Sequence, residues 1–530
     1  MIITELQQLY ATHPNVEGMC KLLKDNSVRH LYCSGLCASA ASLFSSVLVQ
    51  QAECPFVFIL GDLEEAGYFY HDLTQILGTG QVLFFPSSFR RAIKYGQKDA
   101  ANEILRTEVL SRLQKGEEGL CVVTYPDALA EKVVSRKELG DKTLKLHVGE
   151  KVDMDFVTEV LRSYGFEYVD YVYEPGQYAV RGSIIDVFSF SSEFPFRIDF
   201  FGDEVESIRT FEVESQLSKE KKEEIVIVPD LSRSLEQGGN GGMVSFLDFL
   251  RPDTLLAMRD FLWLRERIQV VHDESLTAQA IAACEAEENG AISLEGKLID
   301  GGEFTLRALD FRRMEFGTKP TGTPDATVAF STVAQPIFHK NFDLVAESFR
   351  DYLSRNYTLY ICSDSLKQTD RIRAIFEDRG DNISFTPVER TLHEGFADDT
   401  LRLCIFTDHQ LFDRFHKYNL KSDKARSGKV ALSLKELNQF TPGDYVVHTD
   451  HGVGRFTGLV RIPNGDTTQE VMRLVYQNDD VVFVSIHSLH KVSKYKGKEG
   501  EAPRLNKLGT GAWEKLKDRT KTCLLYTSPS

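Results

Sequence analysis

The sequence predicts a multidomain α/β protein: an α/β domain with an inserted α+β module, then a small α/β domain, then a small, strongly bent β-barrel. Residues 1 to about 145 alternate helical periodicity with short apolar runs, the pattern of a parallel sheet covered by helices. Residues 176–211 have instead the pattern of an antiparallel meander, and residues 435–495 hold several short strands with glycine corners. At 530 residues the chain is long enough for several separate cores.

Composition excludes several classes of protein. Hydrophobic residues make up 42% of the chain and charged residues 26%, and no apolar run approaches the roughly 18 residues that cross a bilayer. Nine cysteines occur without a Cys-x-x-Cys pair, which argues against a zinc finger or a disulfide framework. The net charge of −16 argues against a chain that coats nucleic acid. We therefore expect a soluble, cytoplasmic monomer with no membrane segment.

The first α/β domain is predicted to begin with helices and short buried strands. The expected helices are Leu6–Leu23 and Ala38–Gln50, and the expected strands are Leu31–Cys33, Phe56–Leu60, Val82–Phe85 and Leu120–Val123. Domains of this kind often bind a nucleotide at the loop that follows the first strand. That loop therefore decides whether the domain has nucleotide chemistry.

The loop after the first strand departs from a phosphate-binding loop. Such a loop has the pattern Gly-x-x-x-x-Gly-Lys-Ser/Thr, in which the lysine contacts the β- and γ-phosphates and the hydroxyl binds Mg²⁺. Gly35 and Ser42 are present, but Ala40 stands in place of the second glycine and Ala41 in place of the lysine. Because no side-chain cation faces the phosphates, we expect a degenerate nucleotide site, no bound cofactor and no catalytic residue in this domain.

The meander has two distinct faces. Side chains alternate along a strand, so Phe196, Ile198 and Phe200 share one face and Arg197 and Phe201 share the other. The first is a core face. An aromatic residue beside an arginine on the other face is typical of a protein–protein hot spot. The alternative is that the phenylalanine packs under a helix and the arginine pairs with a nearby carboxylate.

The rest of the chain divides at changes of pattern. A helix that starts after Asp153 and stops at Gly165 leads into the meander, so we place the inserted module at residues 145–212, between residues 1–144 and 213–318 of the first domain. Helices are expected around Phe246 and at Ala278–Glu288. The small α/β domain, residues 319–416, should contain helices Phe342–Leu353 and Leu366–Asp378 and strands Thr358–Cys362 and Leu401–Thr407.

A linker at residues 417–434 precedes the predicted barrel at residues 435–497. Its expected strands include Glu470–Tyr476 and Val481–Ser485, with an exposed strand at Gly458–Pro463. The neighbouring residues His448, Asp450 and His451 have no fourth ligand at a metal-site spacing, so we expect no metal here.

The meander resembles a strand pair that the excision-repair protein UvrB shares with the bacterial transcription-repair coupling factors. The matching segments are Tyr178–Asp186 and Arg197–Val205. The resemblance implies that the module binds the damage-recognition subunit of excision repair through Arg181, Arg197 and Phe201. Coupling factors share the departure in the phosphate loop, whereas UvrB keeps a working loop.

The predicted barrel resembles the polymerase-interacting module of the coupling factors. The match lies in the run His448 to Arg455, which ends in His-Gly-Val-Gly-Arg. The resemblance implies strand addition to the β subunit of RNA polymerase, with Ile462 as the apolar contact and Leu459 and Arg461 beside it.

Together these resemblances imply an adaptor in transcription-coupled nucleotide-excision repair. The basic residues 498–521 resemble the helix that leads, in coupling factors, to an ATP- and Mg-dependent DNA translocase, and residues 522–530 match nothing in that family. We therefore expect that this chain is not itself an enzyme, and that the motor and most DNA contacts of the parent protein lie elsewhere. Two alternatives remain: a UvrB-like ATPase, which Ala40 and Ala41 oppose, and a transcription regulator built on the barrel, which the large front half opposes.

Overall fold

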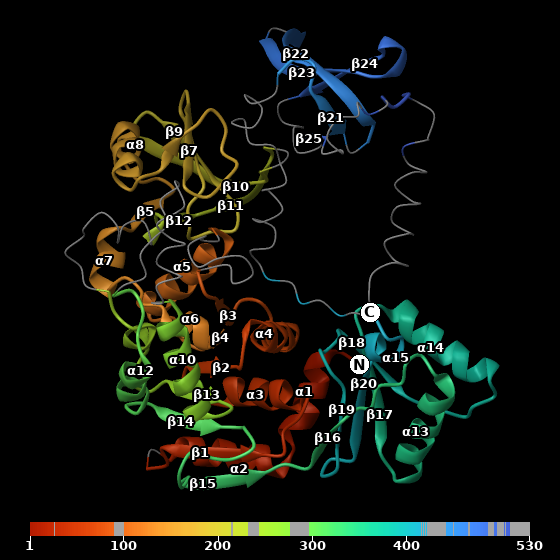
Figure 1. The fold of residues 1–530 in the computed structure, drawn as a ribbon. Coiled ribbons are helices and arrows are strands. Elements are labelled where there is room, and N and C mark those ends of the chain that lie inside the picture. Colours follow the sequence, from red (N-terminus) through yellow and green to blue (C-terminus); the bar gives the residue numbers. More distant parts are fainter. Residues whose placement is uncertain are drawn as a thin grey trace. The chain divides into compact units, whose positions relative to one another are not determined.

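The fold was analysed in a computed structural model. The structure describes residues 1–25, 27–52, 54–88, 100–213, 216–231, 243–275, 296–414, 441–448, 450–464, 467–485 and 492–495, with the shorter pieces 416, 418, 420, 503, 505–508 and 513. The chain divides into two compact units, of which the first contains Met1–Lys142 and Leu231–Lys421 and the second contains Thr143–Asp230 and Ser422–Ser530 (Figure 1).

The first unit contains a seven-stranded parallel sheet. Its strands are β1 (His30–Ser34), β2 (Phe56–Ile59), β3 (Val82–Phe85), β4 (Cys121–Thr124), β13 (Leu255–Met258), β14 (Arg312–Glu315) and β15 (Ala326–Ala329). Their order is β15-β1-β14-β13-β2-β4-β3, and every neighbouring pair is parallel. Since β13 to β15 come after the module in sequence, the chain leaves this sheet and returns to it, as expected.

Helices flank the sheet (Figure 1). They are α1 (Ile3–Ala11), α2 (Pro14–Lys24), α3 (Ala40–Gln51), α4 (Leu63–Leu77), α5 (Ala100–Lys115), α6 (Pro126–Ala130), α7 (Arg136–Asp141), η1 (Phe246–Phe249), α10 (Phe261–Ser275) and α12 (Gly301–Ala308). The single helix expected over Leu6–Leu23 is wrong: Pro14 starts a second helix, whose N-cap is His13. The helix expected at Ala278–Glu288 lies outside the described residues.

A second, five-stranded sheet completes the first unit. It contains β16 (Thr332–Ala334), β17 (Thr358–Ser363), β18 (Thr386–Glu389), β19 (Phe396–Asp398) and β20 (Leu403–Thr407), in the order β16-β19-β20-β17-β18, with helices α13 (Phe342–Ser354), α14 (Leu366–Asp378) and α15 (Asp408–Leu411). The start of the chain joins this sheet, because the amide of Glu389 donates to the carbonyl of Met1 at 2.9 Å. Tyr10 of α1 also donates to Asp398 of β19 at 3.1 Å.

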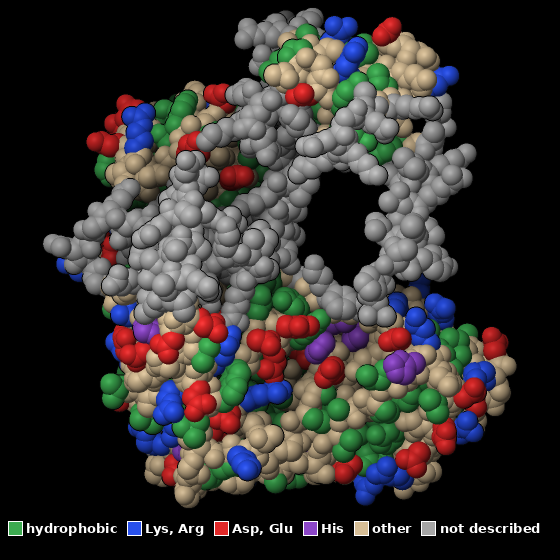
Figure 2. Space-filling view, viewed as in Figure 1, with side chains coloured by type: hydrophobic (Ala, Val, Ile, Leu, Met, Phe, Trp, Pro, Cys, Tyr) green, Lys and Arg blue, Asp and Glu red, His purple; other side chains and the backbone are tan. Residues whose placement is uncertain are grey.

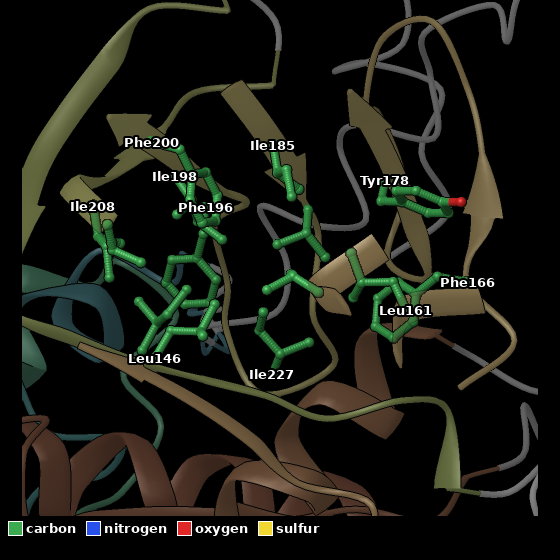
Figure 3. Packing of buried hydrophobic residues seen from close by; sticks show 14 residues of the cluster. Leu146, Leu161, Phe166, Tyr178, Ile185, Phe196, Ile198, Phe200, Ile208 and Ile227 are labelled. Carbon is green, nitrogen blue, oxygen red and sulfur yellow. The ribbon is translucent and has the colours of Figure 1, made fainter. Parts of the chain in front are cut away.

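The inserted module is a six-stranded sheet backed by a helix and a strand pair. Its elements are β5 (Leu144–His147), α8 (Met154–Ser163), β6 (Glu167–Tyr168), β7 (Gln177–Arg181), β8 (Ile184–Val187), β9 (Phe196–Phe201), β10 (Glu204–Phe211), β11 (Ser218–Lys222) and β12 (Glu224–Ile227). The sheet order is β11-β10-β9-β8-β7-β6, and β12 pairs with β5. Phe196, Ile198 and Phe200 face a core that also contains Leu161 and Ile227 (Figure 3).

The C-terminal strands form an open sheet. They are β21 (Tyr445–His448), β22 (Gly452–Asn464), β23 (Thr467–Val475), β24 (Val481–Ser485) and β25 (Val492–Lys494), with the turn η3 (Gln477–Asp479) before β24. Their order is β24-β23-β22-β21-β25. The closed barrel expected from the sequence is therefore wrong for the described residues, since β24 and β25 remain at opposite edges. No helix among the described residues combines the length and the apolar character that a membrane crossing needs.

Candidate functional site

The face of β9 that points away from the module core carries the three residues singled out by the sequence. Arg197 and Phe201 alternate with the core residues of β9 in the expected way. Arg181 lies at the end of β7, where it pairs in register with Ile184 of β8. The structure therefore places Arg181 and Arg197 on neighbouring strands around β8, and Phe201 at the end of β9.

A buried carboxylate holds both arginines. Asp186 of β8 is fully buried and is the register partner of Arg197. Arg197 donates to it twice, from Nε to Oδ1 at 2.8 Å and from Nη2 to Oδ2 at 2.9 Å, and Arg181 also pairs with Oδ2. The hydrogen bond to Asp186 raises the pKa of Arg197. Two arginines on one carboxylate leave this part of the face with a net positive charge.

Aromatic rings fix the same two guanidinium groups from the side. The guanidinium of Arg197 lies 4.6 Å from the ring centre of Phe211, and that of Arg181 lies 4.9 Å from the ring centre of Tyr171. Arg197 also donates to the carbonyl of Gln216 at 3.2 Å. The side chains keep 34% of their surface exposed for Arg181 and 15% for Arg197. They are thus held rigidly, with Arg181 the more accessible of the two.

Phe201 is exposed. Its exposed fraction, 79%, is the highest among the large hydrophobic residues that the structure describes. The alternative in which this phenylalanine packs under a helix is therefore wrong, whereas an ion pair for Arg197 is confirmed. Its partner is Asp186; the nearer residue in sequence, Asp199, pairs with Arg209 instead. The role of Asp186 was missed because it depends on the register between β8 and β9.

The degenerate phosphate loop lies at a cavity of about 340 Å³ in the first unit. Gly35 has a positive φ of 76°, and a side chain there would overlap the carbonyl of Phe330, so only glycine fits the turn. Ala41 and Ser42 line the cavity, and Ala40 is buried in α3 beside them. The loop thus keeps the backbone turn of a nucleotide site and lacks its lysine.

The other walls of this cavity are acidic. They include Asp62, Glu64, Asp72 and Glu394, and the lining cation Arg259 is paired with Glu65. Burial raises the pKa of Asp72 to about 7. Acidic and histidine side chains gather on this unit (Figure 2). A polyphosphate would meet several carboxylates and no free lysine, so electrostatics oppose nucleotide binding here.

One edge of β22 is free of strand partners among the described strands. β21 pairs with Gly452–Arg455 only, whereas β23 follows β22 along its other side from Arg455 to Asn464. Leu459 is 38% exposed on this segment. The backbone of Arg461 and Ile462 belongs to β22, but their side chains lie outside the described residues. The geometry offers an open strand edge for pairing with another chain.

Comparison with known proteins identifies both surfaces as parts of known domains. Residues 144–232 match the family model described as the UvrB interaction domain, and residues 440–496 match the CarD-like/TRCF RID domain. The chain is similar over 92% of its length, at 24% identity, to the transcription-repair-coupling factors of Staphylococcus aureus (strain bovine RF122 / ET3-1) and Bacillus subtilis (strain 168). It covers 47% of each, so it spans about half the length of these relatives. These matches confirm the resemblance to the N-terminal part of coupling factors.

Proposed function

We propose that this chain, given its similarity to the N-terminal part of transcription-repair-coupling factors, acts as an adaptor in transcription-coupled nucleotide-excision repair. The module at 144–232 would bind the damage-recognition subunit of excision repair, and the sheet at 440–496 would bind the β subunit of RNA polymerase. The family matches support both partners.

The observation that carries the first half is the exposure of Phe201 beside two immobilised arginines. Exposed phenylalanine and rigid arginine are the residue types that dominate interface hot spots. Because Asp186 and the rings of Phe211 and Tyr171 already fix the guanidinium groups, little side-chain entropy is lost when a partner binds. The net positive charge of the pair favours an acidic partner surface.

The second half rests on the free edge of β22. An exposed strand edge binds an extended segment of a partner through main-chain hydrogen bonds, and side chains near the edge provide specificity. Leu459 is exposed there, and Ile462 remains the proposed apolar anchor. A nucleotide-driven activity for the first domain is disfavoured, because its cavity has Ala41 in place of lysine and is lined by carboxylates.

A bridging experiment tests the adaptor. RNA polymerase is immobilised, the full chain is added, and the damage-recognition subunit is then passed over the surface. We expect this subunit to be retained only when the chain is present. Phe201→Ala should leave the chain on polymerase and lose the damage-recognition subunit, whereas Ile462→Arg should lose the chain itself. If polymerase-bound Phe201→Ala retained the damage-recognition subunit at the unchanged level, the assignment of the module face would be contradicted.

A further inference from the structure

Residues that follow α15 lie back on α4, within the first unit. We define His416, Tyr418 and Leu420 as the clasp. The hydroxyl of Tyr68 in α4 donates to the carbonyl of His416 at 2.8 Å. The ring of Tyr418 packs edge-on against that of Tyr68, with centres 5.0 Å apart, and Leu420 is 6% exposed. The clasp therefore holds the chain at the point where the linker to the C-terminal sheet begins.

A glycine inside α4 makes room for the clasp. Gly67 is the fifth residue of a 15-residue helix, a position where glycine costs about 1 kcal/mol relative to alanine. A methyl group on Gly67 would overlap the ring of Tyr418. Gly18, inside α2, has nothing within 4 Å of the same position. The glycine in α4 is thus explained by close contact with the clasp, and the two glycines form a matched pair.

Four histidine rings meet where the clasp is docked. His416 lies 4.3 Å from His409 in a stacked arrangement, 5.0 Å from His71 and 6.2 Å from His393, between ring centres. Tyr68 stacks on His393 at 3.5 Å. The Nε2 atoms of His71 and His416 and the Nδ1 atom of His393 are buried without a hydrogen-bond partner. No three side chains among the described residues are placed to hold a metal ion.

Charges around these rings do not stabilise an imidazolium. The groups that face the histidines are Asp72, Asp364, Glu394, Asp408 and Arg414. Burial, followed by repulsion from the other rings, lowers the pKa of His71 and His393 to about 4. Burial also lowers the pKa of His409 to about 4, and that of His416 falls in the same direction for the same reason. The docked cluster is therefore neutral at neutral pH.

We propose that the clasp is a releasable latch on the linker, closed while the four histidines are neutral and opened when they take up protons. Opening frees residues 416–420 from α4. Five residues add about 17 Å to the reach of a fully extended tether. The latch thus sets how far the C-terminal sheet can travel from the first unit. This inference does not depend on the identity of the partners.

The direction of the pH effect follows from the shifts. Each histidine has a lower pKa when docked than when released, so the docked state is fully favoured above about pH 6.5 and loses this advantage as the pH falls towards 4. A single histidine whose pKa returns from about 4 to 6.5 favours the released state about 30-fold at pH 5.

The first test is Gly67→Ala, with Gly18→Ala as the matched control. Both replace a mid-helix glycine by a better helix former, so both variants should keep or gain thermal stability. Hydrogen exchange of residues 412–420 in the full chain, at pH 7.5, should increase at least tenfold in Gly67→Ala and remain unchanged in Gly18→Ala. Equal protection of this segment in all three proteins would overturn the latch.

The second test is pH. Exchange of residues 412–420, corrected for the intrinsic effect of pH, should increase about 30-fold or more between pH 7.5 and pH 5, while β17 and β20 stay protected. His416→Phe keeps a ring without a titratable group and should reduce this increase. Exchange that is independent of pH in the unmodified chain, or an increase that spreads equally to β17 and β20, would show that protonation does not open the clasp.

Discussion

Replacing Phe201 by alanine should separate binding from folding in the module. Full burial of a phenylalanine side chain is worth about 1.5–3 kcal/mol. Since 79% of Phe201 is exposed in the free chain, covering it with a partner could contribute roughly 1.2–2.4 kcal/mol. The dissociation constant for the damage-recognition subunit should therefore rise about 8- to 60-fold. Isothermal titration of the full chain with that subunit measures this directly.

The matched control is Phe156→Ala. Phe156 is also exposed, at 52%, and lies on α8 of the same module, away from the arginine face. Both variants should melt within about 1–2 °C of the unmodified chain, because surface substitutions usually change stability by less than about 0.5 kcal/mol. Equal losses of affinity in the two variants, or none in Phe201→Ala, would refute the hot-spot reasoning. Arg197→Ala is a poor probe, since it removes a partner of buried Asp186 and should cost about 3 kcal/mol of stability.

Three further predictions concern other sites. Titration of the chain with ATP and Mg²⁺ should give no saturable heat at millimolar ligand, because Ala41 supplies no cation; a micromolar site would contradict this. Ile462→Arg should abolish capture of polymerase β by the chain, since a desolvated charge at the interface costs several kcal/mol, whereas Val481→Arg on the opposite edge strand should not. Asp398→Asn should lower the melting temperature at pH 7 and have less effect near pH 3; hydrogen bonds outweigh burial and lower the pKa of Asp398, so its contribution is present above the unfolded pKa and is lost as the pH falls. An equal effect at both pH values would contradict that explanation.

The sequence was most informative where one local rule decided the structure. The helix expected over Leu366–Asp378 has these bounds in the structure, because helical periodicity and the glycine at 380 agree. The alternation of faces in β9 was predicted for the same reason: apolar residues recur with the period of a strand. The degenerate phosphate loop follows from side-chain chemistry alone.

Long-range pairings account for what sequence reasoning missed. Asp186 can be recognised as the anchor of both arginines only when the register of β7, β8 and β9 is known, and register depends on contacts remote in sequence. The contact of Gly67 with Tyr418 joins residues 351 positions apart, so only an unexplained glycine within a helix pattern pointed to it. Pro14 was a local signal for a helix start that the prediction overlooked.

The arginine face illustrates how burial and function can reinforce one another. Asp186 lies on β8 between the strands that carry Arg181 and Arg197, where a lone carboxylate would be unstable. The two arginines stabilise it, and in return it fixes their guanidinium groups towards the surface. Flexible arginines would lose about 0.5–1.5 kcal/mol each on being ordered by a partner. Here that ordering occurs when the module folds, so the exposed Phe201 and the prearranged cations can meet a partner with little further loss of entropy.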